Sequence, residues 1–164
     1  MYADGSPMNH HDWMKERIRE YESLKDAEWD LDTLLRVHIG LNDRSSEIPY
    51  AAMDTLLELA RRYPDEHGFS PVSMVAYFIF MFPVQTGYRL RIFREMCEIG
   101  SEAADSEVLG LMDNSIRNGD FREFLEILIE LRKTEVLRDL MTKSYSRNKT
   151  RILDEFRDRL PDSE

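Results

Sequence analysis

Residues 70–83 read Ser-Pro-Val-Ser-Met-Val-Ala-Tyr-Phe-Ile-Phe-Met-Phe-Pro, within the longest largely apolar run of the chain. Ser70 is suited to cap free backbone N–H groups, and Pro71 fits the first position of a helix. Pro83 ends or kinks such a helix because it has no N–H group to donate. The stretch therefore predicts a helix from Pro71 to Phe82. Since this helix is apolar nearly all round, we expect it to be central and covered on most sides.

Apolar residues keep helical spacing on both sides of this stretch, and no segment alternates for long with period two. The chain has only six Pro and seven Gly, so few positions interrupt the helices. The pattern predicts an all-α fold of about six to eight helices, joined by short polar turns into antiparallel hairpins packed side by side. A right-handed array of the tetratricopeptide kind fits this layout. The expected helices cover residues 12–41 (broken near 24–28), 49–63, 71–82, 88–99, 105–117, 120–131 and 136–160 (interrupted near 144–148).

Three local signals support these boundaries. Gly100 and Asn118-Gly119 are suited to end helices, because glycine adopts the left-handed conformation of a helix C-terminus. Asp120 and Glu123 have capping-box spacing, with Asp in place of the usual Ser or Thr. In the first region, we expect one inward stripe formed by Trp29, Leu31, Leu34, Leu35, His38, Ile39 and Leu41.

Length and composition predict a single helical domain over residues 12–160 of the 164. Residues 1–11 are interpreted as a flexible leader or tag remnant, and residues 161–164 as a tail. No secretory signal or membrane-spanning run is visible, and one cysteine, Cys97, indicates a reducing compartment. We therefore expect an intracellular protein that does not insert into membranes. The net charge of −10 argues against a surface devoted to nucleic acid.

No motif of phosphate-binding loops, nucleophile elbows or metal sites occurs, so we predict no enzyme, no cofactor and no metal. His10 and His11 fall in the expected leader, His38 on the inward stripe, and His67 in a solvated turn. Cys97 lies on an apolar stripe and is expected to be packed. The acidic cluster is interpreted as a solvated helix face and consists of Asp26, Glu28, Asp30 and Asp32.

Two groups of residues remain as candidates for binding. The first lies on the helix 88–99, where arginines are expected on the outside beside an aromatic residue; its members are Tyr88, Arg89, Arg91 and Arg94. The second is a basic segment with one aromatic in an otherwise acidic chain, formed by Lys143, Tyr145, Arg147, Lys149 and Arg151. Such a segment can hold single-stranded RNA. The alternative is a basic helix end that pairs with acidic neighbours.

Four segments, in order, resemble the GANP/Sac-three family of mRNA-export scaffolds, whose helical domain belongs to the PCI group. Leu34–Ile39 is similar to the family's arginine-aromatic-His-Ile helix, with Val37 in place of the aromatic, and Met53–Tyr63 is similar to its Leu-rich helix ending in Tyr. Val75–Phe80 is similar to its buried Ala-Tyr helix, and Ser115–Phe124 to its Gly-Asn-Tyr turn and helix. A fifth, weaker match is Arg147 to Phe156. The family's acidic-Leu-Thr segment and the winged-helix module of PCI proteins are not recognisable.

The resemblance implies a PCI-like array of helices and a scaffold that holds partner proteins in nuclear mRNA export or RNA processing. The implied partners are a winged-helix PCI subunit or nuclear-pore and export factors, and the implied location is nuclear or nucleocytoplasmic. Two other functions stay open. One is a compact helical-bundle adaptor of the Bcl-two type that binds an amphipathic helix. The other is a small protein that binds single-stranded RNA through the basic segment.

Overall fold

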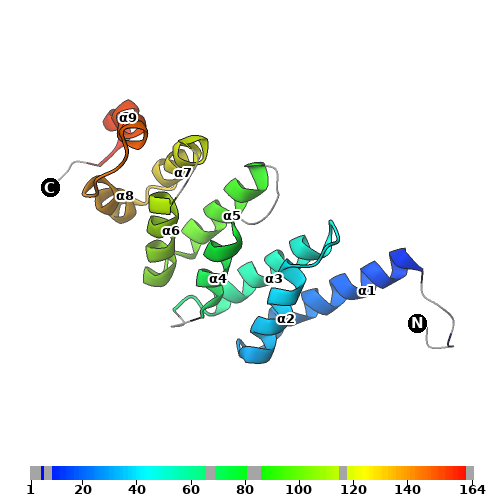
Figure 1. Ribbon diagram of the computed structural model, residues 1–164. Coiled ribbons are helices and arrows are strands. Elements are labelled where there is room, and N and C mark those ends of the chain that lie inside the picture. Colours follow the sequence, from blue (N-terminus) through cyan, green and yellow to red (C-terminus); the bar gives the residue numbers. More distant parts are fainter. Residues whose placement is uncertain (1–4, 6–8, 66–68, 81–85, 115–117, 162–164) are drawn as a thin grey trace. The chain divides into compact units, whose positions relative to one another are not determined.

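The computed structural model describes residues 5, 9–65, 69–80, 86–114 and 118–161. Within these residues the chain is all-α, as predicted, with nine α-helices, two short 3-10 turns and no strand (Figure 1). The count is close to the six to eight helices expected. The helices are α1 His10–Ser23, α2 Leu31–Leu41, α3 Ile48–Arg62, α4 Pro71–Phe78, α5 Thr86–Ile99, α6 Glu102–Asn114, α7 Asn118–Glu130, α8 Thr134–Met141 and α9 Arg147–Glu155; the turns are η1 Leu24–Asp26 and η2 Arg157–Arg159.

Backbone contacts divide the chain into two compact units, residues 1–63 and 64–164. In the first unit, α3 packs against both α1 and α2 (Figure 1). The Thr55 hydroxyl on α3 donates to the Tyr21 carbonyl at 2.7 Å, and Arg62 donates to the carbonyls of Lys25 and Ala27. These bonds attach α3 to the end of α1 and to the turn that follows it.

Gly40 allows α2 to approach its neighbours closely. A Cβ atom at this position would lie 2.6 Å from two ring carbons of Tyr21 and 2.8 Å from the Cβ of Ala52. The side of α2 that faces α1 and α3 is therefore its side with small residues, which includes buried Thr33 and Val37. The predicted inward stripe is wrong for Leu31, Leu35 and Ile39, which are exposed, whereas Leu41 is buried as expected.

We expect Gly40→Ala to lower the free energy of unfolding by about 1–3 kcal/mol through overpacking, although alanine favours helices more than glycine does. Gly110→Ala in α6 is the matched control. A Cβ atom there meets nothing within 4 Å, so the same change should stabilise by about 0.5–1 kcal/mol. Urea unfolding followed by circular dichroism measures both. Stabilisation by Gly40→Ala equal to that of Gly110→Ala would show that Tyr21 and Ala52 do not restrict this position.

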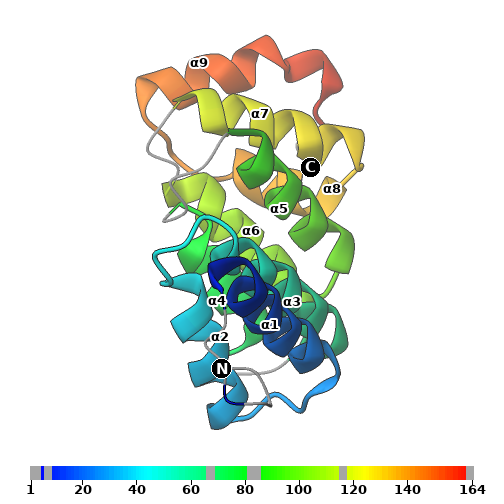
Figure 2. The ribbon, with the colours of Figure 1, turned by 90° about the vertical axis from the view of Figure 1, so that its right-hand side faces the viewer.

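In the second unit, each helix packs against the helix two positions further along the chain. The helices α5, α7 and α9 follow one another in one row, and α4, α6 and α8 form a second row. Figure 2 shows α9 beside α7 and α7 beside α5. The two rows meet where α5 packs on α6 and α7 on α8. A short connection, Gly100-Ser101, joins α5 of one row to α6 of the other. This is the stack of helix hairpins that the sequence predicted.

The helix α4 begins at Pro71 with Ser70 as its cap, as predicted: the Ser70 hydroxyl accepts from the Ser73 amide at 3.0 Å. It ends at Phe78, earlier than the expected Phe82. Pro83 explains an early end, since a helix continued through it would leave the Ile79 carbonyl without an amide partner. The helix is also less covered than expected, because Tyr77 is 66% exposed.

Other boundaries vary in how well they were predicted. Gly100 ends α5 with a φ of +69°, and the interruption before α9 falls at residues 142–146 with Ser146 as the cap; both confirm the sequence signals. Two expectations are wrong. Asn9 caps α1, so His10 and His11 belong to a helix and not to a leader. Asn118 and Gly119 begin α7, so Asp120 lies in its first turn and is not its cap.

Several expectations fall outside the described residues. They concern His67, the end of the apolar run at 81–83, residues 115–117 of the fourth resembling segment, most of the leader and the tail 162–164. The single domain over residues 12–160 stays a prediction beside the two compact units. In the described part of the chain, no helix is both long and apolar enough to span a bilayer.

Candidate partner-binding surface

Arg89 is buried, not on the outside of α5 as expected. The residue is 7% exposed, and its guanidinium donates to the Asp120 carboxylate of α7 at 3.2 Å. The side of α5 that carries Arg89 faces α7, and a cation there needs a carboxylate partner because burial removes its water. Arg89 therefore connects two helices of the row and does not present its charge to a partner.

Arg94 and Arg91 lie nearer the surface. Arg94 forms an ion pair with Glu130 at the end of α7, so it also links α5 to α7. Arg91 is exposed, 5.9 Å from the centre of the Tyr88 ring and 3.8 Å from Glu95. Of the four predicted contact residues on α5, Tyr88 and Arg91 are the two that form a local aromatic and cationic surface.

A third ion pair extends this row of helices. Arg122 of α7 binds Glu155 of α9, and this hydrogen bond lowers the pKa of the Glu155 carboxyl below its usual value. Among the described residues, three charge pairs thus connect α5, α7 and α9, one buried and two at the surface. Surface pairs add little stability individually, but each of these restricts how one helix can slide along the next.

The basic segment folds back onto the end of α6. Lys143 pairs with the Asp113 carboxylate, and the Tyr145 hydroxyl donates to the same carboxylate at 2.8 Å. Burial and this hydrogen bond raise the pKa of Tyr145 above its usual value. Lys149 is 8% exposed, and its ammonium donates to the carbonyls of Met112 and Asp113 at 3.0 and 2.9 Å.

Lys149 therefore acts as a C-cap of α6, supplied by another helix. Its ammonium also lies 5.3 Å from the centre of the Phe121 ring and 5.5 Å from that of Tyr145. Burial lowers the pKa of Lys149 below its usual value. The buried Lys149 ammonium is therefore used within the fold, whereas Arg147 and Arg151 are exposed on α9.

We expect Lys149→Met to lower the free energy of unfolding by about 1.5–3 kcal/mol, because two helix-end carbonyls lose a charged donor while the aliphatic packing is kept. Arg147→Met, on the exposed side of the same helix, should change it by less than about 0.5 kcal/mol. Thermal and urea unfolding give both values. Equal effects of the two substitutions would mean that the Lys149 hydrogen bonds do not stabilise the folded chain.

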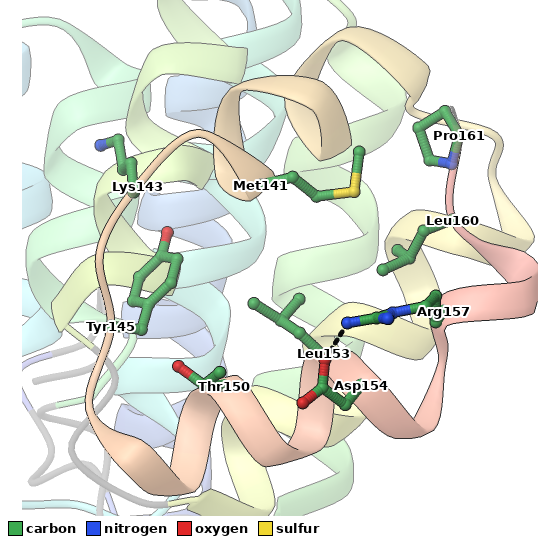
Figure 3. Close-up of a pocket in the computed structure, with 9 residues that line it drawn as sticks. All are labelled: Met141, Lys143, Tyr145, Thr150, Leu153, Asp154, Arg157, Leu160 and Pro161. Carbon is green, nitrogen blue, oxygen red and sulfur yellow. Dashed lines mark hydrogen bonds and ion pairs between the residues drawn. The ribbon is translucent and has the colours of Figure 1, made fainter. Parts of the chain in front are cut away.

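A cavity of about 480 Å³ opens between the end of α8, the following loop and α9 (Figure 3). Its lining combines apolar and polar side chains: Met141, Lys143, Tyr145, Thr150, Leu153, Asp154, Arg157, Leu160 and Pro161. Figure 3 shows Tyr145 and Thr150 on one side and Leu160 and Pro161 on the other. Arg157 donates to Asp154 at 2.7 Å. The cavity is large enough for an apolar side chain of a partner and has charged groups at its edge.

The remaining candidate residues are in less specific surroundings. His38 is exposed, and its ring lies 3.4 Å from the Asn42 amide, so the expected inward position is wrong. His10 is exposed on α1 and stacks on Trp13. No group of three or more His, Cys, Asp or Glu side chains suited to a metal occurs among the described residues.

Cys97 is buried in α5, and burial raises the pKa of its thiol to about 12. At pH 8 we expect a thiol reagent to label native Cys97 slower by on the order of a thousandfold than a thiol with the ordinary pKa of about 8.5, because the thiolate is the reactive form. The chain in urea is the control. Absorbance during labelling with a chromogenic disulfide measures the rates, and fast labelling of the native chain would contradict this burial.

The sequence missed the partners of the binding candidates. Nothing in the sequence marks Asp113 as the partner of Lys143 or Asp120 as the partner of Arg89, because the two residues of each pair lie 30 and 31 positions apart in the chain. The resembling segments lie in α2, α3, α4 and α7, where the structure describes them. Comparisons of the chain with protein families, curated proteins and solved structures find no match, so the family resemblance stays a prediction that rests on those segments.

Proposed function

We propose that this chain is a non-enzymatic scaffold that binds partner proteins in nuclear mRNA export or RNA processing. The single observation that supports a scaffold is the stack α4–α9, in which each helix packs against the helix two positions further along the chain. A stack of this kind holds the sides of its helices in fixed positions and can present an extended surface to other proteins. The narrower assignment to mRNA export comes from the resemblance to the GANP/Sac-three family.

The contact surface of this scaffold consists of two parts of the second unit. One is the exposed Arg91 of α5, whose guanidinium lies beside the half-buried ring of Tyr88. The other is the cavity beside α9, which can receive an apolar side chain. Aromatic and arginine side chains are enriched among residues that dominate binding energy, so both parts suit protein recognition.

RNA binding through the basic segment has less support. Lys143, Tyr145 and Lys149 contact Asp113 and the end of α6, so Arg147 and Arg151 are the exposed cations of the segment that lie outside these contacts. Binding of a phosphate backbone needs several cations in one groove. A compact bundle around a central helix also has less support, because α4 exposes Tyr77.

The test is quantitative affinity capture with the full chain as bait, from a nuclease-treated extract of the cells that make it. Thr150→Phe places a large side chain in the cavity. Asn148→Phe, at an exposed residue of the same helix outside the cavity lining, is the matched control. We expect a set of proteins that binds the unchanged chain and the control but is lost with Thr150→Phe.

The identity of that set tests the narrower proposal. Winged-helix PCI subunits, nuclear-pore proteins or export factors in the set would support a role in mRNA export. A reproducible set without them would keep the scaffold and refute that role. If no protein is enriched over an unrelated acidic helical protein, the scaffold proposal fails.

A further inference from the structure

The inner side of α9 has the side-chain spacing of a helix bound in a groove. Lys149 and Ile152 are the buried residues of this helix, and Phe156, which follows it, is also buried. These positions are separated by three and four residues, so they lie on one side of a helix, as the anchors of amphipathic helices do when they bind other proteins. The other positions of α9, apart from half-buried Leu153, are polar and exposed; they are Arg147, Asn148, Thr150, Arg151, Asp154 and Glu155.

The groove that holds these anchors is formed by the end of α6 and by α7. Two carbonyls at the end of α6 accept from the Lys149 ammonium, which also lies over the Phe121 ring of α7. Arg122 of α7 pairs with Glu155 and lies 6.0 Å from the centre of the Phe156 ring. Because α6 and α7 also pack against α5 and α8, the groove does not depend on α9 for its own structure.

One flank of α9 borders a space that the helix does not fill. The cavity of about 480 Å³ runs along α9 at Thr150, Leu153 and Asp154 (Figure 3). Well-packed helices leave no void of this size between them. A helix with a larger apolar side chain in the place of Thr150 would therefore bury more surface here than α9 does.

The helix α9 is held by fewer buried side chains than its neighbour in the row. It buries Lys149 and Ile152, whereas the buried residues of α7 are Asp120, Phe121, Phe124, Leu125, Ile127 and Leu128. A helix of nine residues is also too short to be stable alone in water. Opening of α9 therefore costs less free energy than unfolding of the whole chain, and it exposes the groove.

We propose that α9 is an exchangeable internal ligand, and that a helix of a partner protein displaces it and binds the same groove. The seated helix α9 shows which chemistry the groove accepts. The partner segment is an amphipathic helix with the pattern Lys-x-x-Ile-x-x-Glu-Phe, found here at residues 149–156, and with an apolar residue larger than threonine directly after the lysine. The partner is a protein held by the proposed scaffold, so the exchange rests on that function and adds that α9 controls access to the site.

A fluorescent peptide of residues 143–161 tests the exchange on the full chain, with binding followed by fluorescence anisotropy. The chain's own α9 competes with the peptide, so a weakened α9 should strengthen peptide binding. Lys149→Met and Phe156→Ala in the chain do not change the groove residues of α6 and α7, and each should tighten peptide binding by on the order of tenfold. Arg147→Met, on the exposed side of α9, is the matched control and should bind the peptide as the unchanged chain does. Circular dichroism confirms that each variant is folded.

A charge exchange tests whether the peptide occupies the groove. With Arg122→Glu in the chain, Glu155 of the unchanged peptide faces a carboxylate, and Glu126 of α7 adds to the repulsion. The peptide with Glu155→Arg should bind this variant about fivefold more tightly than the unchanged peptide does. Arg151 of the peptide lies near position 155 and adds to the attraction. Both peptides are compared on one chain, so the state of its own α9 is the same in both measurements.

The cavity is tested on the chain with Lys149→Met. The peptide with Thr150→Leu should bind it about tenfold more tightly than the unchanged peptide, because the leucine fills part of the cavity. Absence of this gain would overturn the larger apolar residue of the partner.

The exchange itself is overturned by peptide binding that is equal for all chain variants, or by no binding to Lys149→Met and Phe156→Ala up to about 500 µM. Equal binding of the two peptides to Arg122→Glu would also overturn it. If the peptide fails but affinity capture still yields proteins that are lost with Thr150→Phe, α9 is not exchanged and the scaffold stands.

Discussion

Asp120→Ala is expected to lower the free energy of unfolding by about 3–5 kcal/mol, because it removes the carboxylate that faces a buried guanidinium. Arg89 and Asp120 are both nearly inaccessible, with side chains 9% and 6% exposed. Neither water nor salt can replace the lost carboxylate inside the row of helices. Urea unfolding followed by circular dichroism measures the change.

The matched control is Glu135→Ala, which removes the carboxylate of an exposed pair with Arg138. It should change stability by less than about 1 kcal/mol. The double change Arg89→Met with Asp120→Leu should recover part of the loss, because it leaves no buried charge without a partner. A loss for Asp120→Ala as small as that of Glu135→Ala would refute this account of the pair.

Phe124→Ala is expected to cost about 3–5 kcal/mol of folding free energy by opening a cavity in the second unit. Phe124 of α7 is fully buried, and its ring stacks on that of Phe93 of α5 with the centres 4.0 Å apart and the planes within 3°. Neighbouring rings that stack in this way add attraction beyond the area they bury. Removing the ring therefore loses both contributions between α5 and α7.

Phe69→Ala is the control for this substitution, because Phe69 is 86% exposed. Its effect should stay within about 0.5 kcal/mol. Thermal unfolding should show the same order of stability, with Phe124→Ala lowest. A loss of less than about 1 kcal/mol for Phe124→Ala is well below the usual cost of truncating a core aromatic, and it would mean that the two helices do not share this core.

The all-α class and most helix positions could be predicted because they depend on local signals. Ser70 and Pro71 begin α4, and Gly100 ends α5, each for reasons contained within one turn of backbone. Asp120 shows the limit of such reasoning. It has capping-box spacing with Glu123, but in the structure its carboxylate serves Arg89 from a different helix.

The orientation of α2 could not be predicted from its largest apolar residues. The helix buries Thr33, Val37, Gly40 and Leu41, since the small residues among them let α1 and α3 approach. Close approach over a glycine leaves no strong apolar signal in a sequence. The same holds for Arg89 and Lys149, whose burial depends on acceptors 31 or more residues away.

In the stack α4–α9 each helix packs against the helix two positions further along the chain. This arrangement has a consequence for the kinetics of folding and unfolding. Because each helix contacts mainly elements close to it along the chain, few long loops must close before native contacts form, and hairpins can be added one after another. The reverse process begins at an end of the row. The helix α9 packs mainly on α7 and η2, so it can detach while α5, α6 and α7 stay folded, and its amide hydrogens then exchange with solvent ahead of theirs.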